Sequence, residues 1–409
     1  MIEIKPFRAY RPEEDYVSRV AALPYDVVDN EETKRLIRNN PYSFLNVDKP
    51  EAYAQKMPQK TCYEIAGQYL QYLMKKGILI QEDTPCLYIY GLESVYTNQY
   101  GIVGCLSCQD YEDGKIKKHE NTREDKEAER ILHVASCKAH TGPIFLACKE
   151  EEVLKQLIEE QMKQQQPLYE FSQDGIRQIV YRISGKQEIH KIAECFKELD
   201  ALYVADGHHR LKAAVTYAKQ QKEAGTSDED AAEYNHFLGV VFPKSYLRIM
   251  DYNRVIKDES GLSQSELMNA LAQDFEVTPI EGESYKPYKQ HVIGMSYKKQ
   301  WYQLALKENR IKELDVVARL DTSILQSFIL EPIFKIKDPR TDKRIDFVSG
   351  IKGIEGLNEQ MEQGMDIAFT LYPVDVDELI AVADAQELMP PKSTWFEPKL
   401  RSGLFIHVF

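Results

Sequence analysis

The sequence of 409 residues lacks the features by which membrane-spanning and secreted proteins are identified. No apolar run approaches the roughly 18 residues that a membrane span requires, and the first residues carry no apolar signal region. The seven cysteines are odd in number and scattered among mostly apolar neighbours, which is not the pattern of a disulfide framework. We therefore expect a cytoplasmic protein with no membrane partner.

Basic residues are outnumbered by acidic ones, with 52 Lys and Arg against 65 Asp and Glu. The formal net charge is −13, whereas proteins that bind nucleic acid usually present a basic face to the phosphates. We expect no nucleic-acid partner, and the acidic balance favours a function directed at small molecules.

Several motifs that would assign a chemistry at once are absent. The sequence has no GxxxxGK[ST] and no strand–GxGxxG–helix, which excludes a P-loop and a dinucleotide fingerprint. It also has no HExxH and no GxSxG. Cys105 and Cys108 form a lone CxxC in a segment predicted to be a strand, where the two thiols would point to opposite faces. A zinc site is therefore not expected there.

The composition that is present, 43% hydrophobic and 29% charged, is typical of a globular protein. A chain of this length usually forms two or three domains. Predicted helices and strands alternate along it, which indicates an α/β (α+β) fold. We expect an N-terminal α/β region at 1–110, a core at 111–260 with an insertion at 150–200, and a C-terminal α/β region at 261–409.

The core contains the most informative pattern. A helix is predicted at 126–138, a strand at 144–147, a second strand at 201–205 and a helix at 209–221, with Gly207 in the turn between the last two. A strand followed by a tight glycine turn and a helix aims backbone N–H groups and the positive helix end at an anion.

The residues at this turn are Asp206, Gly207, His208, His209 and Arg210. Gly207 permits a close approach of the backbone, and the Arg210 guanidinium matches a phosphate. Asp206 is a candidate for holding a metal or orienting a hydroxyl. The alternative is a polar loop in which the aspartate caps the following helix.

Two further segments carry polar residues in suggestive groups. His119 and Glu120 are candidates for a general base, although the segment also fits a solvated loop in which Thr122 and Asp125 cap the next helix. The tail at 390–399 suits an anion or carboxylate site and equally fits a plain loop; its candidate residues are Lys392, Ser393, Thr394 and Lys399.

A set of motifs spread over the whole chain resembles the prokaryotic family known as domain of unknown function 1015. The motifs are Leu23-Pro24-Tyr25-Asp26-Val27, Asn40-Pro41 with Pro50-Glu51, His119-Glu120-x-Thr122, Ala205 to Arg210, and Met389 to Thr394 with Pro398-Lys399 and Ser402-Gly403-Leu404.

The middle segment also resembles the ParB/sulfiredoxin-type nucleotide-binding fold, here with an insertion of roughly fifty residues between Ile144 and Ala201. Relatives that phosphorylate free L-serine carry an HE and a DGHHR-like motif. The resemblance implies that Glu120 is the base, assisted by Asp206 and His119, while Gly207, His208, His209 and Arg210 cradle nucleotide phosphates. Thr122, Lys392, Ser393 and Thr394 are then expected to bind the substrate.

The function implied by this resemblance is a small-molecule kinase that forms O-phospho-L-serine from L-serine, with ATP or ADP as the phosphate donor and Mg²⁺ as the cofactor. The residues that would hold a metal stay unassigned. A regulatory module that binds ATP or CTP without turnover is the main alternative. A sulfiredoxin-like phosphoryl transfer and a nuclease are others, and the acidic balance disfavours the nuclease.

Overall fold

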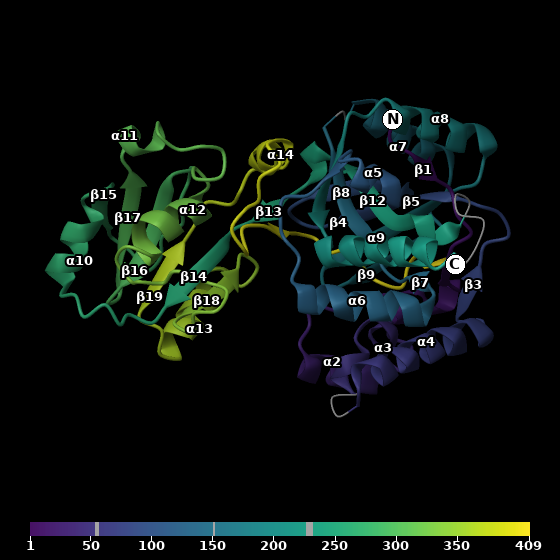
Figure 1. Ribbon diagram of the computed structural model, residues 1–409, viewed down its shortest axis with the longest axis horizontal. Coiled ribbons are helices and arrows are strands. Elements are labelled where there is room, and N and C mark those ends of the chain that lie inside the picture. Colours follow the sequence, from purple (N-terminus) through teal and green to yellow (C-terminus); the bar gives the residue numbers. More distant parts are fainter. Residues whose placement is uncertain (54–56, 150–151, 226–231) are drawn as a thin grey trace. The chain divides into compact units, whose positions relative to one another are not determined.

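The computed structural model describes residues 1–53, 57–149, 152–225 and 232–409 (Figure 1). The chain forms two compact units. Unit 1 contains Met1–Leu247 and Pro398–Phe409, and unit 2 contains Arg248–Glu397. Within the described ranges, every helix is too short or too polar to cross a membrane.

Unit 1 is built on a mixed nine-stranded sheet with the order β6-β11-β8-β12-β5-β4-β10-β9, and β1 pairs with β5. The pairs β6–β11 and β8–β12 are parallel, and the other neighbours are antiparallel. The strands are β1 Ile4–Lys5, β4 Leu87–Glu93, β5 Asn98–Ser107, β6 Ile116–Lys117, β8 Ile144–Cys148, β9 Tyr169–Gln173, β10 Ile176–Ile183, β11 Leu202–Asp206 and β12 His236–Pro243.

Helices pack against this sheet around two apolar cores. One core joins the strands to α7, α8 and α9, and the other lies among α1 to α4, α6 and the C-terminal Ile406. The longer helices of unit 1 are α2 Asn30–Asn39, α4 Gln59–Lys75, α6 Glu124–Cys137, α7 Glu152–Gln164, α8 Lys186–Lys197 and α9 His208–Glu223. The short ones are α1 Val17–Val20, α3 Leu45–Asp48 and α5 Cys108–Glu112, and β2 Tyr10–Pro12, β3 Leu79–Gln81, β7 Ala139–His140 and β21 His407–Val408 form two small ladders.

Unit 2 contains a six-stranded antiparallel sheet in the order β15-β17-β16-β19-β14-β18. Its strands are β14 Tyr252–Ile256, β15 Phe275–Ile280, β16 Val292–Tyr297, β17 Gln300–Leu306, β18 Ile345–Ser349 and β19 Ile367–Thr370, with β13 Ile249–Met250 paired to β20 Trp395–Phe396. Its helices are α10 Gln264–Leu271, α11 Glu308–Ile311, α12 Asp321–Leu325 with a π-helical turn Gln326–Leu330, α13 Gly353–Glu362 and α14 Val376–Asp384.

The mixed α/β fold agrees with the expectation from the sequence, but the units divide the chain elsewhere than at 110 and 260. β5 from the first expected region pairs with β12 from the second, so both regions share one sheet. β14, expected in the core, belongs to the sheet of unit 2. The insertion at 150–200 supplies β9 and β10, which extend the large sheet at one edge beyond β4.

The cysteines of the CxxC occupy a strand end and a helix start. Cys105 lies in β5 and Cys108 begins α5, so the predicted continuous strand ends between them at Ser107. Both thiols are buried, and burial raises the pKa of Cys108 to about 12 and that of Cys105 well above its usual value. Buried neutral thiols of this kind are inert.

Candidate functional site

The HE and DGHHR segments meet because they follow neighbouring parallel strands. β6 ends at Lys117 and pairs in parallel with β11, which ends at Asp206. Carboxyl ends of parallel strands lie at the same edge of a sheet, and ligand sites form there. The loop after β6 therefore places His119 and Glu120 beside His208.

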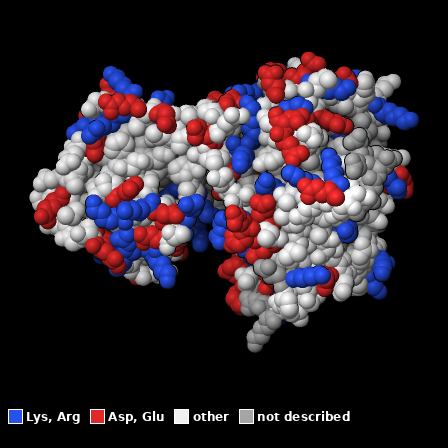
Figure 2. All heavy atoms as spheres, viewed as in Figure 1, with Lys and Arg blue, Asp and Glu red and all other residues white. Residues whose placement is uncertain are grey.

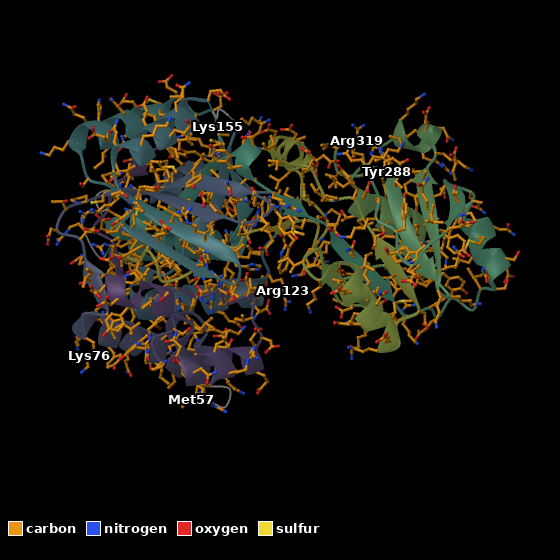
Figure 3. All side chains as sticks on the ribbon, turned by 180° about the vertical axis from the view of Figure 1, so that it is seen from behind. Met57, Lys76, Arg123, Lys155, Tyr288 and Arg319 are labelled. Carbon is orange, nitrogen blue, oxygen red and sulfur yellow. The ribbon has the colours of Figure 1, made fainter. Side chains whose placement is uncertain are left out.

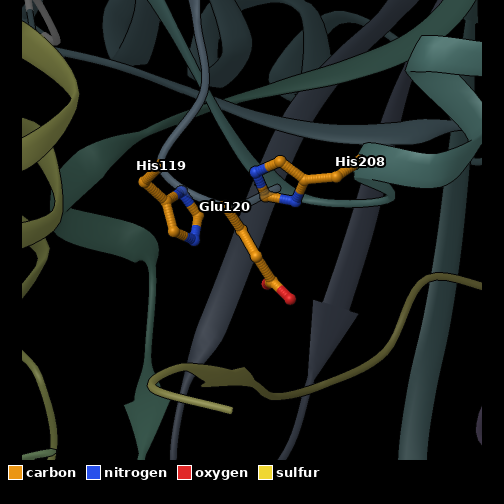
Figure 4. Close-up of side chains that lie close together, drawn as sticks. All are labelled: His119, Glu120 and His208. Atoms are coloured by element: carbon orange, nitrogen blue, oxygen red, sulfur yellow. The ribbon is translucent and has the colours of Figure 1, made fainter. Parts of the chain in front are cut away.

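Three side chains converge at this edge. The imidazole rings of His119 and His208 have centroids 4.6 Å apart and cross at 88°. One ligand atom from each of His119, Glu120 and His208 lies within 4.8 Å of the other two. In Figure 4 the Glu120 side chain starts between the two imidazoles, and its carboxylate lies below both rings in this view. We call these three residues the His–Glu–His cluster.

Burial controls the charge of this cluster. His119 is 1% exposed and His208 is 8% exposed, while Glu120 is partly exposed. Burial lowers the pKa of His119 to about 4, and burial together with the neighbouring His119 lowers the pKa of His208 well below its usual value. Both imidazoles are therefore neutral at pH 7, with a lone pair on one ring nitrogen each.

The turn that starts α9 has the conformation that the sequence predicts. Gly207 adopts φ +90°, a left-handed value that favours glycine, and is the N-cap of α9. Asp206 does not cap the helix. Its Oδ1 accepts a hydrogen bond from the Gly207 N–H at 2.8 Å, so the capping alternative is not what the structure contains.

Asp206 forms an ion pair with Lys399, which the sequence offered as part of an anion or carboxylate site in the tail but not at this turn. The Lys399 ammonium donates to Asp206 Oδ2 at 2.6 Å. Burial alone would raise the pKa of Asp206, but Lys399 and the Gly207 N–H outweigh burial and hold that pKa below its usual value. Lys399 stands 193 positions from Asp206, so the composition of the tail could suggest the lysine but not its pairing with Asp206.

Arg210 is already held by acidic and hydroxyl partners. Its guanidinium pairs with the Asp48 carboxylate at 2.5 Å and donates to Ser402 Oγ at 3.3 Å, and Asp48 also accepts from Thr141 at 3.1 Å. The Tyr25 ring lies 5.0 Å from the guanidinium carbon. Burial would raise the pKa of Asp48, but Arg210, His133 and Arg130 outweigh it and keep the carboxyl ionised. Arg210 thus connects α9 to the N-terminal and C-terminal segments.

His209 and Thr122 connect the loop between β6 and α6 to the neighbouring helices α9 and α6. His209 Nε2 accepts a hydrogen bond from the Arg123 N–H at 3.1 Å, and burial lowers the pKa of His209. Thr122 donates to Glu127 at 3.4 Å and does not cap α6, whose N-cap is Arg123. The Arg123 side chain is exposed and projects outward (Figure 3).

The three tail residues expected at the substrate belong to unit 2. The Ser393 hydroxyl donates to the Pro390 carbonyl at 2.7 Å and is 3.0 Å from the Thr322 hydroxyl. The Lys392 ammonium lies 5.8 Å from the centre of the Tyr252 ring, and Thr394 follows next in the chain. Their role in substrate binding stays a prediction.

The donors of the cluster do not fit Mg²⁺. This ion prefers oxygen ligands in octahedral geometry and usually keeps several waters, whereas the cluster offers two imidazoles and one carboxylate. Both Asp206 oxygens are engaged by Gly207 and Lys399. Neither the cluster nor Asp206 therefore suits Mg²⁺.

On the face drawn in Figure 2, acidic and basic side chains are interspersed over both units. A continuous basic stripe of the kind that follows a nucleic-acid backbone does not cross this face.

Residues 4–323 match the model of a protein family described as protein of unknown function (DUF1015). No curated protein matches the sequence. Among solved structures, a free serine kinase variant in complex with ADP has 13% sequence identity and a TM-score of 0.38, covering 74% of this chain and 92% of that chain. SbnI with a C-terminal truncation, from Staphylococcus aureus, has 12% identity and a TM-score of 0.38, covering 75% and 87%. A conserved hypothetical protein from Pyrococcus furiosus has 11% identity and a TM-score of 0.36, covering 74% and 94%.

Proposed function

The chain belongs to the DUF1015 family. From the meeting of its HE and DGHHR segments we propose that it is a phosphotransferase acting on a small hydroxylated molecule. The reaction proposed is the transfer of a phosphoryl group from ATP or ADP to the hydroxyl of L-serine, which yields O-phospho-L-serine. The choice of serine follows the resemblance of the HE and DGHHR motifs to those of free L-serine kinases.

The observation that carries this proposal is the convergence of the two motifs at one sheet edge. Glu120 lies beside the start of α9, with its ligand atom within 4.8 Å of that of His208. A base must lie within hydrogen-bond reach of the hydroxyl that it activates. A hydroxyl placed between Glu120 and a phosphate at the helix start would meet that condition.

Phosphate binding is supported by the start of α9. No side chain of the described residues caps this 16-residue helix at its start. The N-cap residue, Gly207, has no side chain of its own that could cover the first backbone N–H groups. Helix N-termini of this kind bind phosphate through backbone N–H groups and the helix dipole. Phosphoryl transfer depends mainly on positioning and on neutralising charge.

Lys399 is the cation that we assign to the phosphates. Its ammonium is fixed by Asp206 at 2.6 Å, and Asp206 directly precedes the Gly207 turn. Arg210, which the motif suggested for this role, pairs with the fully buried Asp48, whereas the Asp206 side chain that holds Lys399 is 37% exposed. We therefore infer that Arg210 positions α9, while Lys399 and the helix start bind the phosphates.

The test measures O-phosphoserine formation from L-serine with ATP or ADP and Mg²⁺ for the wild type and for Glu120→Gln. The glutamine keeps the shape of the side chain but cannot accept the serine proton, so the rate should fall by about a hundred- to ten-thousand-fold. Nucleotide affinity should change little. Glu124→Gln, in the exposed first turn of α6, is the matched control and should retain the wild-type rate.

Two results would count against the proposal. Near wild-type turnover in Glu120→Gln would remove the general base. A wild type that binds nucleotide but phosphorylates neither serine nor any other hydroxylated metabolite in a nucleotide-consumption screen would favour a regulatory module.

A further inference from the structure

We propose that His119, Glu120 and His208 form a binding site for a divalent transition-metal ion of the zinc class, one that accepts imidazole together with carboxylate. The site does not depend on the proposed phosphoryl transfer, because it rests on the cluster's donor atoms alone. The two roles of Glu120 are compatible, because one carboxylate oxygen can bind the ion while the other accepts a proton.

The spacing of the donor atoms supports the proposal. Metal–nitrogen and metal–oxygen bonds to zinc are about 2.0–2.2 Å long, so two ligand atoms on one ion lie roughly 3–3.5 Å apart. The three donor atoms lie within 4.8 Å of one another. Glu120 is partly exposed and follows a two-residue strand. Rotation of its side chain can bring the carboxylate closer to the two imidazoles.

The burial of His208 gives a second and independent observation. Its ring is 8% exposed, and among the described residues its Nε2 has no hydrogen-bond partner. A buried polar atom without a partner costs about 1–3 kcal/mol, and each such atom in a native protein calls for an explanation such as an unplaced water or ion. A metal bound at the cluster would satisfy this lone pair.

His119 has the support that metal-binding histidines usually have. One of its ring nitrogens is hydrogen-bonded to the backbone of Val204 in β11. A hydrogen bond from one imidazole nitrogen to a backbone carbonyl fixes the tautomer and directs the other nitrogen to the metal. His119 is 1% exposed, so its ring cannot turn away into solvent.

The donor set also defines the class of ion. Two imidazoles and one carboxylate are the protein ligands of several catalytic zinc sites and of mononuclear iron sites. Mg²⁺ favours oxygen donors alone. With three protein ligands, a bound ion would keep at least one position open to water or a substrate oxygen.

The experiment measures binding of the metals alone, in the absence of nucleotide and serine. The full chain is stripped with a chelator and titrated with Zn²⁺, Co²⁺, Mn²⁺ or Mg²⁺, followed by calorimetry and by metal analysis after desalting. We expect about one equivalent of Zn²⁺ or Co²⁺ per chain and at least tenfold weaker binding of Mg²⁺. His208→Ala should weaken Zn²⁺ binding at least tenfold, and Glu120→Gln should weaken it as well.

His209→Ala is the matched control, because it removes the adjacent imidazole of the same motif, which lies outside the cluster. Its metal affinity should stay within about threefold of wild type. X-ray absorption of the Zn²⁺-loaded wild type provides a test that needs no variant, and we expect two imidazole ligands at about 2.0 Å. Absence of a tight equivalent in the wild type, an absorption spectrum without two imidazoles, or an undiminished affinity in folded His208→Ala would overturn the proposal. Failure of serine phosphorylation alone would leave it standing.

Discussion

At the scale of single residues, the ion pair between Arg210 and Asp48 decides what the DGHHR arginine does. The Asp48 side chain is fully buried and the guanidinium is 13% exposed. Removing one member of a buried pair leaves an uncompensated charge and typically costs about 3–5 kcal/mol. The motif alone suggests a phosphate ligand, since Arg is the residue that best matches phosphate. The partner could not be foreseen, because Asp48 stands 162 positions away and the family-like stretch at 40–51 gives no sign of a pairing with Arg210.

A double-mutant cycle tests the structural role of this pair. Asp48→Ala and Arg210→Ala should each destabilise unit 1 by about 3 kcal/mol or more, and the double variant should lose at least about 1 kcal/mol less than the sum. Hydrogen exchange of α9 in denaturant measures the stability of unit 1. Arg177→Ala, which removes the more exposed pairs with Glu93 and Glu170, is the control and should cost clearly less than either buried variant. Strict additivity in the cycle would show that the two side chains do not act as a pair.

The buried Asp321 predicts how the stability of unit 2 depends on pH. It is 6% exposed at the start of α12, and burial raises its pKa to about 7, with a further contribution from Glu378. Its folded-state pKa lies above the unfolded value of about 3.9. The native state therefore holds the proton more tightly between about pH 4 and pH 7. The stability of unit 2 associated with this group is present at low pH and is lost as the pH rises towards 7.

Asp321→Asn removes this loss of stability, because an amide does not ionise. The amide oxygen can still accept the hydrogen bond from the His291 N–H, which Asp321 Oδ1 accepts at 2.7 Å. The variant should gain stability over the wild type at about pH 8 and gain much less at about pH 5. Both tryptophans, Trp301 and Trp395, lie in unit 2, so their fluorescence in urea reports its unfolding. The exposed Asp346→Asn is the control. An equal effect of Asp321→Asn at both pH values would refute the raised pKa.

At the scale of secondary-structure elements, the β11–Gly207–α9 unit is the part of the site that the sequence predicted best. Its strand, turn and helix are consecutive, and a glycine marks the left-handed residue, so local rules are sufficient. β6 could not be predicted in the same way. This strand is two residues long. Its position is fixed by pairing with β11, in which Leu202 is the partner of Ile116, 86 residues earlier in the chain. The meeting of the HE and DGHHR segments was therefore implied by the resemblance and not by periodicity.

The two left-handed glycines at the ends of α9 allow a matched test of the helix start. Gly207 has φ +90° and Gly225 has φ +64°, and neither position is crowded enough to clash with an added Cβ. Replacing either by alanine costs about 1–2 kcal/mol of backbone strain. Both variants should lose similar stability, but only Gly207→Ala should weaken nucleotide binding, measured by calorimetry. Equal nucleotide affinities in the two variants would contradict a phosphate site at the start of α9.

At the scale of the whole molecule, unit 1 is assembled from two distant parts of the sequence. Residues 398–409 return to it after the 150 residues of unit 2. They contribute the buried Leu404, Phe405 and Ile406 as well as the ion pair from Lys399 to Asp206. The predicted domain boundaries rested on composition and local pattern. These signals contain no information on strand pairing, so neither the sheet shared across position 110 nor the return of the tail could be foreseen.

Deleting residues 398–409 should therefore disrupt unit 1 and spare unit 2. Loss of three fully buried apolar side chains costs at least about 4–5 kcal/mol by area alone. That is comparable to the stability of a whole domain. We expect α9 and β11 to lose protection from hydrogen exchange, while the tryptophan fluorescence transition of unit 2 stays close to that of the full chain. Protection of unit 1 that survives the deletion would show that the tail is dispensable.

The proposed reaction is tested most directly by following labelled phosphate from the nucleotide. Wild-type protein is incubated with L-serine, Mg²⁺ and either γ-labelled ATP or β-labelled ADP, and the products are separated chromatographically. We predict label in O-phosphoserine with at least one donor, at a rate that falls about a hundred-fold or more in Glu120→Gln. Nucleotide binding without any label in O-phosphoserine, under conditions where the protein is folded, would contradict the assignment of this site to the phosphorylation of serine.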